Sequence, residues 1–333
     1  MVNKKSLTFI DFCSGIGAGR LGLETLGLKC LAHSEINPDS ENTYEKFFND
    51  KNNLGDLTKI NYSKIPNCDI LIAGFPCQTF SIVGKRSGFE DERGQIIYYL
   101  SKILKEKNIP YFIFENVKGL VNHNKGKTLK SIVELLTNTG YTVFYKVLNS
   151  VDYGVPQLRE RVYFVGIRND LCDKDFEFPQ PTQQVNLKEF LLSSNNDILD
   201  IQYSTFQKYL NNKYNYGRVN IDEILQKDYT VIDTRQSDLR TYENKCPTLR
   251  TGRHGLLYVK SGKLYKLSGL EALLLQGFSK EYIFKVTNEN NNKLLSQAGN
   301  AMTVNVINAI GRSLLEYIEE SNSGFGAKRL ANG

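Results

Sequence analysis

A cysteine beside a proline is the side chain best suited to covalent chemistry in this 333-residue sequence. Cys77 stands between Pro76 and Gln78, shortly after the apolar run 70–73. A thiolate is a strong nucleophile that forms near neutral pH, although a lone cysteine is more often a small buried apolar residue. In doubly wound sheets the loops after the strands build the active site, and this placement makes Cys77 a candidate nucleophile.

A glycine-rich turn follows the first apolar run, at Gly15, Gly17 and Gly19. Glycines let the backbone approach a ligand, and the start of the next helix offers free N–H groups. Glu35 lies 20 residues after Gly15, where a carboxylate can accept hydrogen bonds from ribose hydroxyls. The pattern favours a nucleoside cofactor over a purely structural turn. Arg20 occupies the place where a nicotinamide-binding fingerprint has its last glycine.

Further polar residues stand at the ends of apolar runs. Glu115 directly follows the apolar run 111–114. It is a candidate site carboxylate, and the alternative is an ordinary edge residue or helix cap. Arg159 and Arg161 alternate before the run 162–167, so a strand there would point both the same way. The alternative is a pair of surface arginines. Residues 297–302 form a turn that leads into the last helix.

The elements that position these residues alternate between strand-like and helix-like segments. Such alternation predicts an α/β fold, with a doubly wound, mainly parallel sheet covered on both faces. The expected strands are 7–12, 28–32, 70–73, 111–114, 142–148 and 162–167. Apolar residues at helical spacing predict helices within 20–26, 93–107, 129–136, 267–276 and 304–318.

The clean alternation ends near residue 180, and the following residues are rich in Asn, Tyr, Lys and Asp. We therefore expect a second, smaller domain there. The predicted division is a catalytic and cofactor-binding domain over 1–179, a recognition domain over 180–266, and a return to the first domain over 267–320. Residues 321–333 are expected to form a flexible tail.

Charge and composition narrow the class of protein. The net charge is +6, and residues 234–266 alone hold eight basic residues against two acidic ones. This stripe indicates one polyanion contact, or else a solvated lysine-rich surface. No apolar run is long enough to span a membrane and no secretory signal is visible, so we expect a cytoplasmic protein. The six cysteines and three histidines show neither a disulfide framework nor metal-ligand spacing.

Together these motifs resemble the DNA (cytosine-5) methyltransferase family, in the order that this family has them. The match covers roughly residues 7–170 and 267–318 and is specific, because Pro76-Cys77-Gln78, Glu115-Asn116-Val117 and Gln157-x-Arg159-x-Arg161 occur together. The resemblance implies a Rossmann-like methyltransferase that uses S-adenosylmethionine and acts on double-stranded DNA. It also implies a monomeric prokaryotic enzyme, either one of a restriction-modification system, whose cognate endonuclease acts on the same site without contacting it, or an orphan methyltransferase.

The resemblance also assigns the cofactor site. Gly15, Gly17 and Glu35 would hold S-adenosylmethionine, Asp56 would meet its adenine, and Asn300 would close the site. The implied set is Asp11, Phe12, Gly15, Ile16, Gly17, Glu35, Ile36, Asp56, Leu57, Pro76, Asn300 and Ala301. Two positions depart from the family: Cys13 replaces an aromatic residue that packs on the adenine, and Ala18 replaces a glycine. Cys13 predicts weaker cofactor binding, or compensation by another side chain.

The catalytic roles follow from the same resemblance. The Cys77 thiolate would add to carbon 6 of cytosine, and Glu115 would hydrogen-bond ring nitrogen 3 in its protonated form, which burial favours. Arg161, with Arg159 in support, would hold the base oxygen. The base must leave the duplex to reach these groups. The expected DNA contacts are Ser81, Arg235, Gln236, Arg240, Arg250, Arg253 and His254.

Three alternatives remain open from the sequence. The first is an RNA cytosine-5 methyltransferase of the tRNA-directed branch, whose late Cys-Phe-Thr motif is absent here. The second is a nicotinamide-dependent oxidoreductase on the same sheet, which would not require the set Cys77, Glu115 and Arg161. The third is a DNA-binding protein with an inactive methyltransferase fold, which the intact set argues against.

Overall fold

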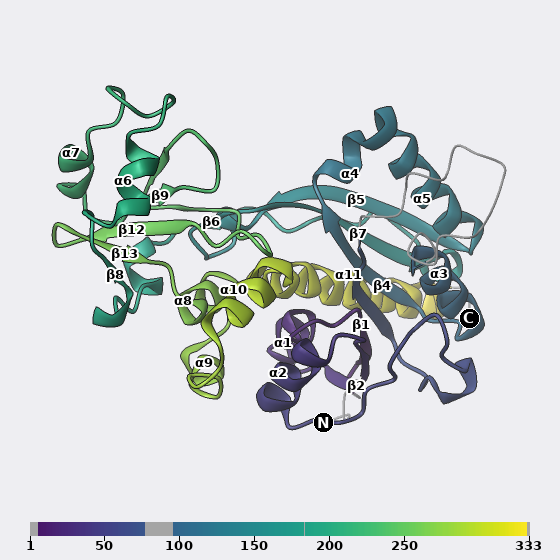
Figure 1. Ribbon diagram of the computed structural model, residues 1–333. Coiled ribbons are helices and arrows are strands. Elements are labelled where there is room, and N and C mark those ends of the chain that lie inside the picture. Colours follow the sequence, from purple (N-terminus) through teal and green to yellow (C-terminus); the bar gives the residue numbers. More distant parts are fainter. Residues whose placement is uncertain (1–5, 77–95, 183, 332–333) are drawn as a thin grey trace. The chain divides into compact units, whose positions relative to one another are not determined.

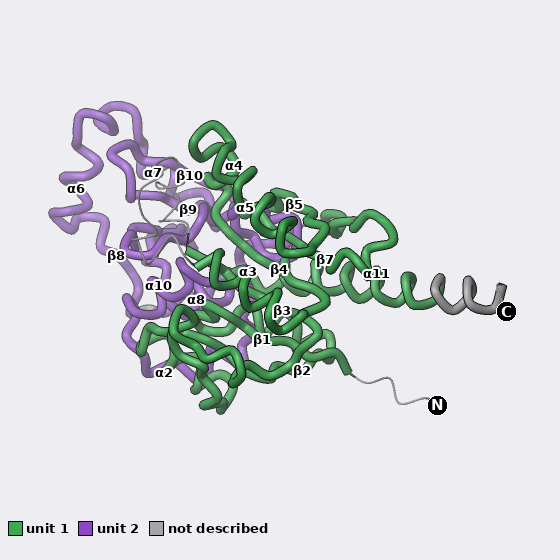
Figure 2. Tube along the Cα trace, turned by 90° about the vertical axis from the view of Figure 1, so that its right-hand side faces the viewer, with its two compact units in different colours: residues 1–148, 160–181, 302–333 green, residues 149–159, 182–301 purple. Residues whose placement is uncertain are grey.

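The computed structural model describes residues 6–76, 96–182 and 184–331, and the chain divides into two compact units. Unit 1 comprises residues 1–148, 160–181 and 302–333, and unit 2 comprises residues 149–159 and 182–301 (Figure 2). Each unit therefore contains segments that are distant in the sequence.

Unit 1 is built on a six-stranded sheet whose order is β2-β1-β3-β4-β7-β5 (Figure 1). Its strands are β1 (Thr8–Phe12), β2 (Lys29–Ser34), β3 (Ile70–Gly74), β4 (Tyr111–Val117), β5 (Tyr141–Asn149) and β7 (Glu160–Arg168). Strand β1 runs parallel to β2 and β3, β3 runs parallel to β4, and β7 is antiparallel to β4. All six expected strands are present, and the parallel-rich α/β sheet is confirmed.

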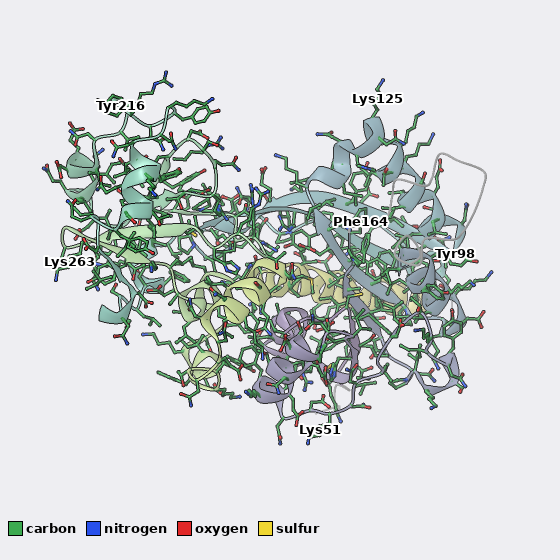
Figure 3. All side chains as sticks on the ribbon, viewed as in Figure 1. Lys51, Tyr98, Lys125, Phe164, Tyr216 and Lys263 are labelled. Atoms are coloured by element: carbon green, nitrogen blue, oxygen red, sulfur yellow. The ribbon has the colours of Figure 1, made fainter. Side chains whose placement is uncertain are left out.

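Helices cover both faces of this sheet. They are α1 (Ala18–Glu24), α2 (Pro38–Phe48), α3 (Ile96–Glu106), α4 (Gly119–Asn122), α5 (Lys127–Asn138) and α11 (Val304–Ala331). On one face, the apolar sides of α3 and α5 join a core that includes Phe114 and Phe164. Figure 3 labels Phe164. On the other face, α1 packs on α11. The approach is close at Gly22, where a Cβ would lie only 2.7 Å from Ile307 Cγ2.

The last helix is longer than expected. Helix α11 continues beyond Ser321, where the sequence predicts a flexible tail, as far as Ala331. Ser321 is buried, and its hydroxyl donates a hydrogen bond of 2.8 Å to Asp173. Tyr317 on the same helix donates to the same carboxylate at 3.2 Å. The expected tail therefore begins as a continuation of the helix, and Tyr317 and Ser321 hold this part of the helix to Asp173.

Unit 2 contains a five-stranded antiparallel sheet with the order β10-β9-β12-β13-β8. Its strands are β8 (Ile198–Leu199), β9 (Thr230–Asp233), β10 (Arg240–Glu243), β12 (Leu256–Lys260) and β13 (Lys263–Lys266). The short strands β6 (Gln157–Leu158) and β11 (Cys246–Pro247) form a separate parallel pair. The helices are α6 (Ser204–Leu210), α7 (Ile221–Leu225), α8 (Gly269–Leu275), α9 (Lys280–Phe284) and α10 (Asn291–Asn300).

The units do not follow the expected domain boundaries at every point. The segment 182–266 lies in unit 2 as the sequence suggests, but 267–301 lies there too, and the chain enters unit 1 again only at Met302. Helices α8 and α10 pack on each other, and Gln157 Nε2 donates to the Leu275 carbonyl at 2.9 Å. The sequence indicates that these helices are amphipathic but not which core they cover. In the described part of the chain, no helix is long and apolar enough to cross a membrane.

Candidate active site

The predicted site residues of unit 1 lie where the parallel strands end. Cys13 and the glycine turn follow β1, and Glu35 follows β2. Pro76 comes two residues after β3, and Glu115 lies near the end of β4, paired in register with Gly74. Because β1 to β4 are parallel, all these residues lie at one edge of the sheet, where α/β proteins bind ligands.

Glu35 is held at this edge by backbone N–H groups. Its carboxylate accepts hydrogen bonds from Gly15 N at 2.7 Å, Ile36 N at 2.9 Å and Asn37 N at 2.7 Å. Asn53 holds the Glu35 backbone from the other side, donating to its carbonyl at 3.0 Å. The position of this carboxylate is therefore fixed by the backbone around it.

The glycines of the turn serve different purposes. Gly15 has a φ of +55°, and a Cβ there would meet no atom within 4 Å, so the backbone is open to a ligand on that side. Gly17 has a φ of +84° and begins α1, and a Cβ there would overlap the Phe48 ring. Gly15 thus leaves space beside the turn, whereas Gly17 allows α1 and α2 to pack.

The other predicted cofactor residues of unit 1 divide by exposure. The side chains of Phe12, Ile16 and Leu57 are buried in the protein, so they can offer only main-chain atoms to a ligand. Ile36, by contrast, is 75% exposed next to Glu35, which is unusual for a large apolar residue. Asp56 is half-buried and accepts hydrogen bonds from Thr58. Pro76 is exposed.

Burial raises the pKa of two acidic groups near the turn, Asp11 and Cys13. Burial raises the pKa of Asp11 well above its ordinary value, although one carboxylate oxygen accepts a hydrogen bond from Arg20 N at 3.1 Å. Burial also raises the pKa of the Cys13 thiol. Cys13 has a positive φ of 51°, a strained conformation for a non-glycine residue. Its thiol is therefore protonated at neutral pH and is a poor nucleophile.

Glu115 forms an ion pair with Arg161, whose Nε lies 3.1 Å from a Glu115 oxygen. Both side chains are largely buried. The antiparallel pairing of β4 with β7 sets Tyr163 opposite Glu115 and Arg161 opposite Val117, so Arg161 is a diagonal neighbour on the same face. A carboxyl group and a guanidinium group thus meet at the edge of the sheet that carries the glycine turn.

Asn116 ties these residues to the segment that leads to the predicted nucleophile. Its side-chain amide is buried and donates to the Phe75 carbonyl at 2.9 Å, two residues before Cys77. The sequence places Asn116 within a family motif but gives it no role; a buried amide after an apolar strand was the available signal. Cys77 and Ser81 lie outside the described residues.

Comparisons with known proteins identify the family. The sequence pattern described as C-5 cytosine-specific DNA methylase matches residues 7–316. The chain belongs to this family. It is a DNA (cytosine-5) methyltransferase, in agreement with the resemblance that its motifs carry.

Known type II methyltransferases are similar to this chain over nearly its whole length. It is 36% identical to the type II methyltransferase M.HaeII of Haemophilus aegyptius, covering 94% of this chain and 94% of that protein. It is 33% identical to the type II methyltransferase M.DsaV of Dactylococcopsis salina, covering 96% and 88%. Among solved structures, the DNMT2 of Spodoptera frugiperda has the same fold, with a TM-score of 0.67, 20% identity and coverage of 94% and 99%.

The two arginines of the motif Gln157-x-Arg159-x-Arg161 have different partners. Arg159 is buried in unit 2, where its guanidinium donates to the carbonyls of Leu249 at 3.2 Å, Gly299 at 3.2 Å and Ala301 at 2.7 Å. Arg161 instead pairs with Glu115 in unit 1. The expectation of two arginines pointing the same way is wrong, because β6 ends at Leu158 and a different strand begins at Glu160.

The late motif of the methyltransferase lies at the end of α10 in unit 2. Ala301 is buried, and Asn300 is exposed. A Cβ on Gly299 would overlap the backbone of Arg250 and Thr251, so only a glycine permits this approach. This close packing and the hydrogen bond from Arg159 to Leu249 fix the segment 248–251, a role that the sequence alone does not reveal.

The predicted DNA contacts differ in their exposure and in their ion pairs. Arg235 and Asp233 form a buried ion pair of 2.7 Å, with side chains 3% and 7% exposed, and Arg235 also donates to the Thr248 carbonyl at 2.8 Å. Arg235 is therefore a support for the segment 248–251 rather than an exposed DNA contact. Burial opposes ionisation of Asp233, but hydrogen bonds from Arg235 hold the pKa of Asp233 below its ordinary value.

The remaining candidates are more accessible. Arg250 and Arg253 are exposed and line a hollow of unit 2 together with His254, which lies 3.1 Å from Ser296 Oγ. The other two expected contacts are Arg240, exposed and paired with Asp238 at 2.9 Å, and Gln236, which is half-buried. In the described part of the chain no cluster of side chains could hold a metal ion.

The glycine turn offers a first test. Gly17→Ala should destabilise the protein by about 1–2 kcal/mol for its backbone conformation and about 1–3 kcal/mol more for the overlap with Phe48. Gly27→Ala is the matched control, since Gly27 has a φ of +83° and open space around it. Denaturant unfolding measures both. Equal losses in the two variants would show that packing of α1 on α2 does not require Gly17.

Proposed function

We propose that this methyltransferase transfers a methyl group from S-adenosylmethionine to carbon 5 of a cytosine turned out of double-stranded DNA. The carrying observation is the Glu115–Arg161 pair at the edge of the sheet that bears the glycine turn and Glu35. Similarity to type II methyltransferases supports a place in a restriction-modification system. The test is bisulfite sequencing of DNA from cells that express the protein. Absence of methylated cytosine despite soluble protein would contradict the proposal.

The cofactor fits the residues at the turn. S-adenosylmethionine, when bound, supplies an electrophilic methyl group on its sulfonium. Glu35 would accept hydrogen bonds from the ribose, since its carboxylate is fixed and half-buried. Gly15 would let the backbone approach the ligand. Ile36 would pack on the adenine in place of the aromatic residue that Cys13 replaces, because its exposed side chain follows directly after Glu35.

The chemical step would belong to Cys77, Glu115 and Arg161. The Cys77 thiolate adds to carbon 6, which breaks the aromaticity of the ring and moves electron density to carbon 5. Carbon 5 then takes the methyl group. A base such as water would then remove the carbon 5 proton, which restores the double bond and expels the Cys77 thiolate, and the proton that Glu115 gave to nitrogen 3 would return to Glu115. The enzyme is therefore unchanged after each turnover.

Glu115 and Arg161 would stabilise the covalent adduct. Glu115 would donate a proton to ring nitrogen 3 as the thiolate adds, and Arg161 would bind the oxygen on carbon 2. Without a base, their ion pair favours the ionised carboxylate. Glu115 must therefore take up a proton from water before it can donate one to nitrogen 3. Asn116 would keep the Cys77 segment near them by its hold on Phe75.

Recognition of the DNA sequence would fall to the region 180–266, and within it chiefly to Arg250 and Arg253. Both are exposed, and Arg250 lies on the segment that Arg159, Arg235 and Gly299 hold. An arginine on a rigid segment can read guanine with two hydrogen bonds. The buried Arg235 would act only by supporting that segment.

Two arginine variants should therefore fail in different ways. Arg250→Ala should lose about 1–3 kcal/mol of binding energy for the target sequence while unfolding like the wild type. Arg235→Ala should lose about 3–5 kcal/mol of stability, because Asp233 would remain buried without its partner. Denaturant unfolding and DNA-binding titrations on both variants measure this. Normal stability in Arg235→Ala would contradict the assigned supporting role.

A further inference from the structure

A loop of unit 2 outside the family motifs exposes two tyrosines beside basic residues. Residues 212–218, here called the tyrosine loop, contain Lys213, Tyr214, Tyr216 and Arg218, all exposed. Tyr216 is 74% exposed and Tyr214 is 45% exposed, and Figure 3 labels Tyr216 at the edge of this unit. No acidic residue occurs between Asp200 and Asp222. The loop is thus an aromatic and positively charged surface.

A buried asparagine gives the tyrosine loop a fixed shape. Asn215 is 1% exposed, and its amide donates to the carbonyls of Tyr209 at 2.9 Å and Ser237 at 3.2 Å. Its side-chain oxygen accepts a hydrogen bond from Leu239 N at 2.8 Å. The carboxamide therefore pairs with the backbone of 237–239 as a neighbouring strand would. Tyr214 and Tyr216, on either side of Asn215, are therefore exposed on a loop whose shape is fixed by hydrogen bonds.

The same contacts join the tyrosine loop to a segment already expected to meet DNA. The Tyr209 hydroxyl donates to the Gln236 carbonyl at 3.0 Å, and Asn212 donates to the Ser237 carbonyl at 3.0 Å. Gln236 and Arg240 belong to the predicted DNA contacts. The acid between them, Asp238, is paired with Arg240 at 2.9 Å. The loop therefore extends this predicted interface without adding negative charge.

The composition of the tyrosine loop suits phosphates. Lysine, arginine and tyrosine side chains commonly contact the DNA backbone, where such contacts position a protein without reading sequence. Lys213 Nζ lies 5.0 Å from the centroid of the Tyr214 ring, which keeps the cation close to the aromatic surface. Contiguous exposed apolar surface marks binding sites in soluble proteins, and the two exposed tyrosines lie two residues apart on this loop.

We infer that the tyrosine loop binds the phosphate backbone of double-stranded DNA that flanks the target site. This inference rests on the proposed function. Lys213 and Arg218 supply the charge, and Tyr214 and Tyr216 supply hydroxyl donors and apolar contact with the sugars. The loop would therefore raise affinity for long DNA without determining which sequence is methylated.

The test compares two double variants in DNA-binding titrations over a range of salt concentrations. In Lys213→Ala/Arg218→Ala, the slope of log affinity against log salt should fall by about 0.9 for each lost phosphate contact, or about 1.8 in total. The affinity at low salt should fall about tenfold. The matched control is Lys280→Ala/Lys285→Ala, which removes two exposed lysines around α9 in the same unit and should bind DNA like the wild type.

The probe is a duplex that carries the sequence found by bisulfite sequencing, in a short form that ends near the site and a long form with flanking DNA. The basic-residue variant should lose affinity for the long form and bind the short form like the wild type. Tyr214→Ala/Tyr216→Ala should lose affinity for the long form with a nearly unchanged salt slope, because it removes no charge. Thermal unfolding confirms that each variant is folded.

Two results would overturn the inference. One is a wild-type affinity and salt slope for the basic-residue variant on the long duplex. The other is an equal loss in the Lys280→Ala/Lys285→Ala control, which would reflect total charge alone. Failure of the proposed function is distinguishable, since the wild type would then methylate no DNA. A mixed-sequence long duplex would serve as the probe in that case, because phosphate contacts do not depend on sequence.

Discussion

Replacement of Cys77 by serine is expected to abolish methylation while DNA binding survives. A serine hydroxyl is not ionised at neutral pH and cannot add to carbon 6, so the methyl acceptor carbon stays a poor nucleophile. Loss of a covalent nucleophile commonly costs on the order of 10⁴-fold or more in rate. Transfer of a labelled methyl group to DNA measures the rate, and a binding titration measures the affinity.

The control for this variant removes a different thiol. Cys172 is a half-buried free cysteine of unit 1, and Cys172→Ser should keep full activity. Target DNA with 5-fluorocytosine provides a second readout, because fluorine at carbon 5 cannot leave as a proton and the adduct should persist. Wild-type protein should form this covalent complex and Cys77→Ser should not. Activity retained in Cys77→Ser would refute the mechanism.

Replacement of Glu115 by glutamine should reduce the rate of methyl transfer by about 10²- to 10⁴-fold, the usual contribution of a general acid. Glutamine keeps the shape of the side chain and can still hydrogen-bond the base, but it cannot deliver a proton to nitrogen 3. It also leaves Arg161 without the carboxylate that lies 3.1 Å from its Nε. Single-turnover kinetics at saturating DNA separates this chemical step from binding.

The matched control for Glu115→Gln lies on the adjoining part of the same strands. Glu160 forms an exposed ion pair of 2.8 Å with Lys118, just beyond β4. Because exposed pairs contribute only about 0–1 kcal/mol, Glu160→Gln should be nearly as active and as stable as the wild type. A Glu115→Gln enzyme with the wild-type rate would exclude Glu115 as the acid. Equal losses in both variants would point instead to a general effect of lost charge.

The agreement between sequence and structure is best for local features. Each of the six apolar runs of unit 1 is a strand, because a buried strand needs only a short apolar segment with turn residues at its ends. The glycine turn and Glu35 could also be placed, since loops that follow parallel strands meet at one edge. The contact of Ser321 with Asp173 could not be predicted, because the Gly- and Ser-rich composition that follows Ser321 does not reveal which distant side chain it meets.

The sequence by itself determined the order of the strands along the chain, the residue types at their ends and the family to which this enzyme belongs. Tertiary structure alone decided that β7 runs antiparallel to β4, which brings Arg161 to Glu115. It also decided that Arg159 and Arg235 are buried supports. The physical reason is range: periodicity and turn propensity act between neighbouring residues, whereas strand direction and the burial of a charge depend on distant segments.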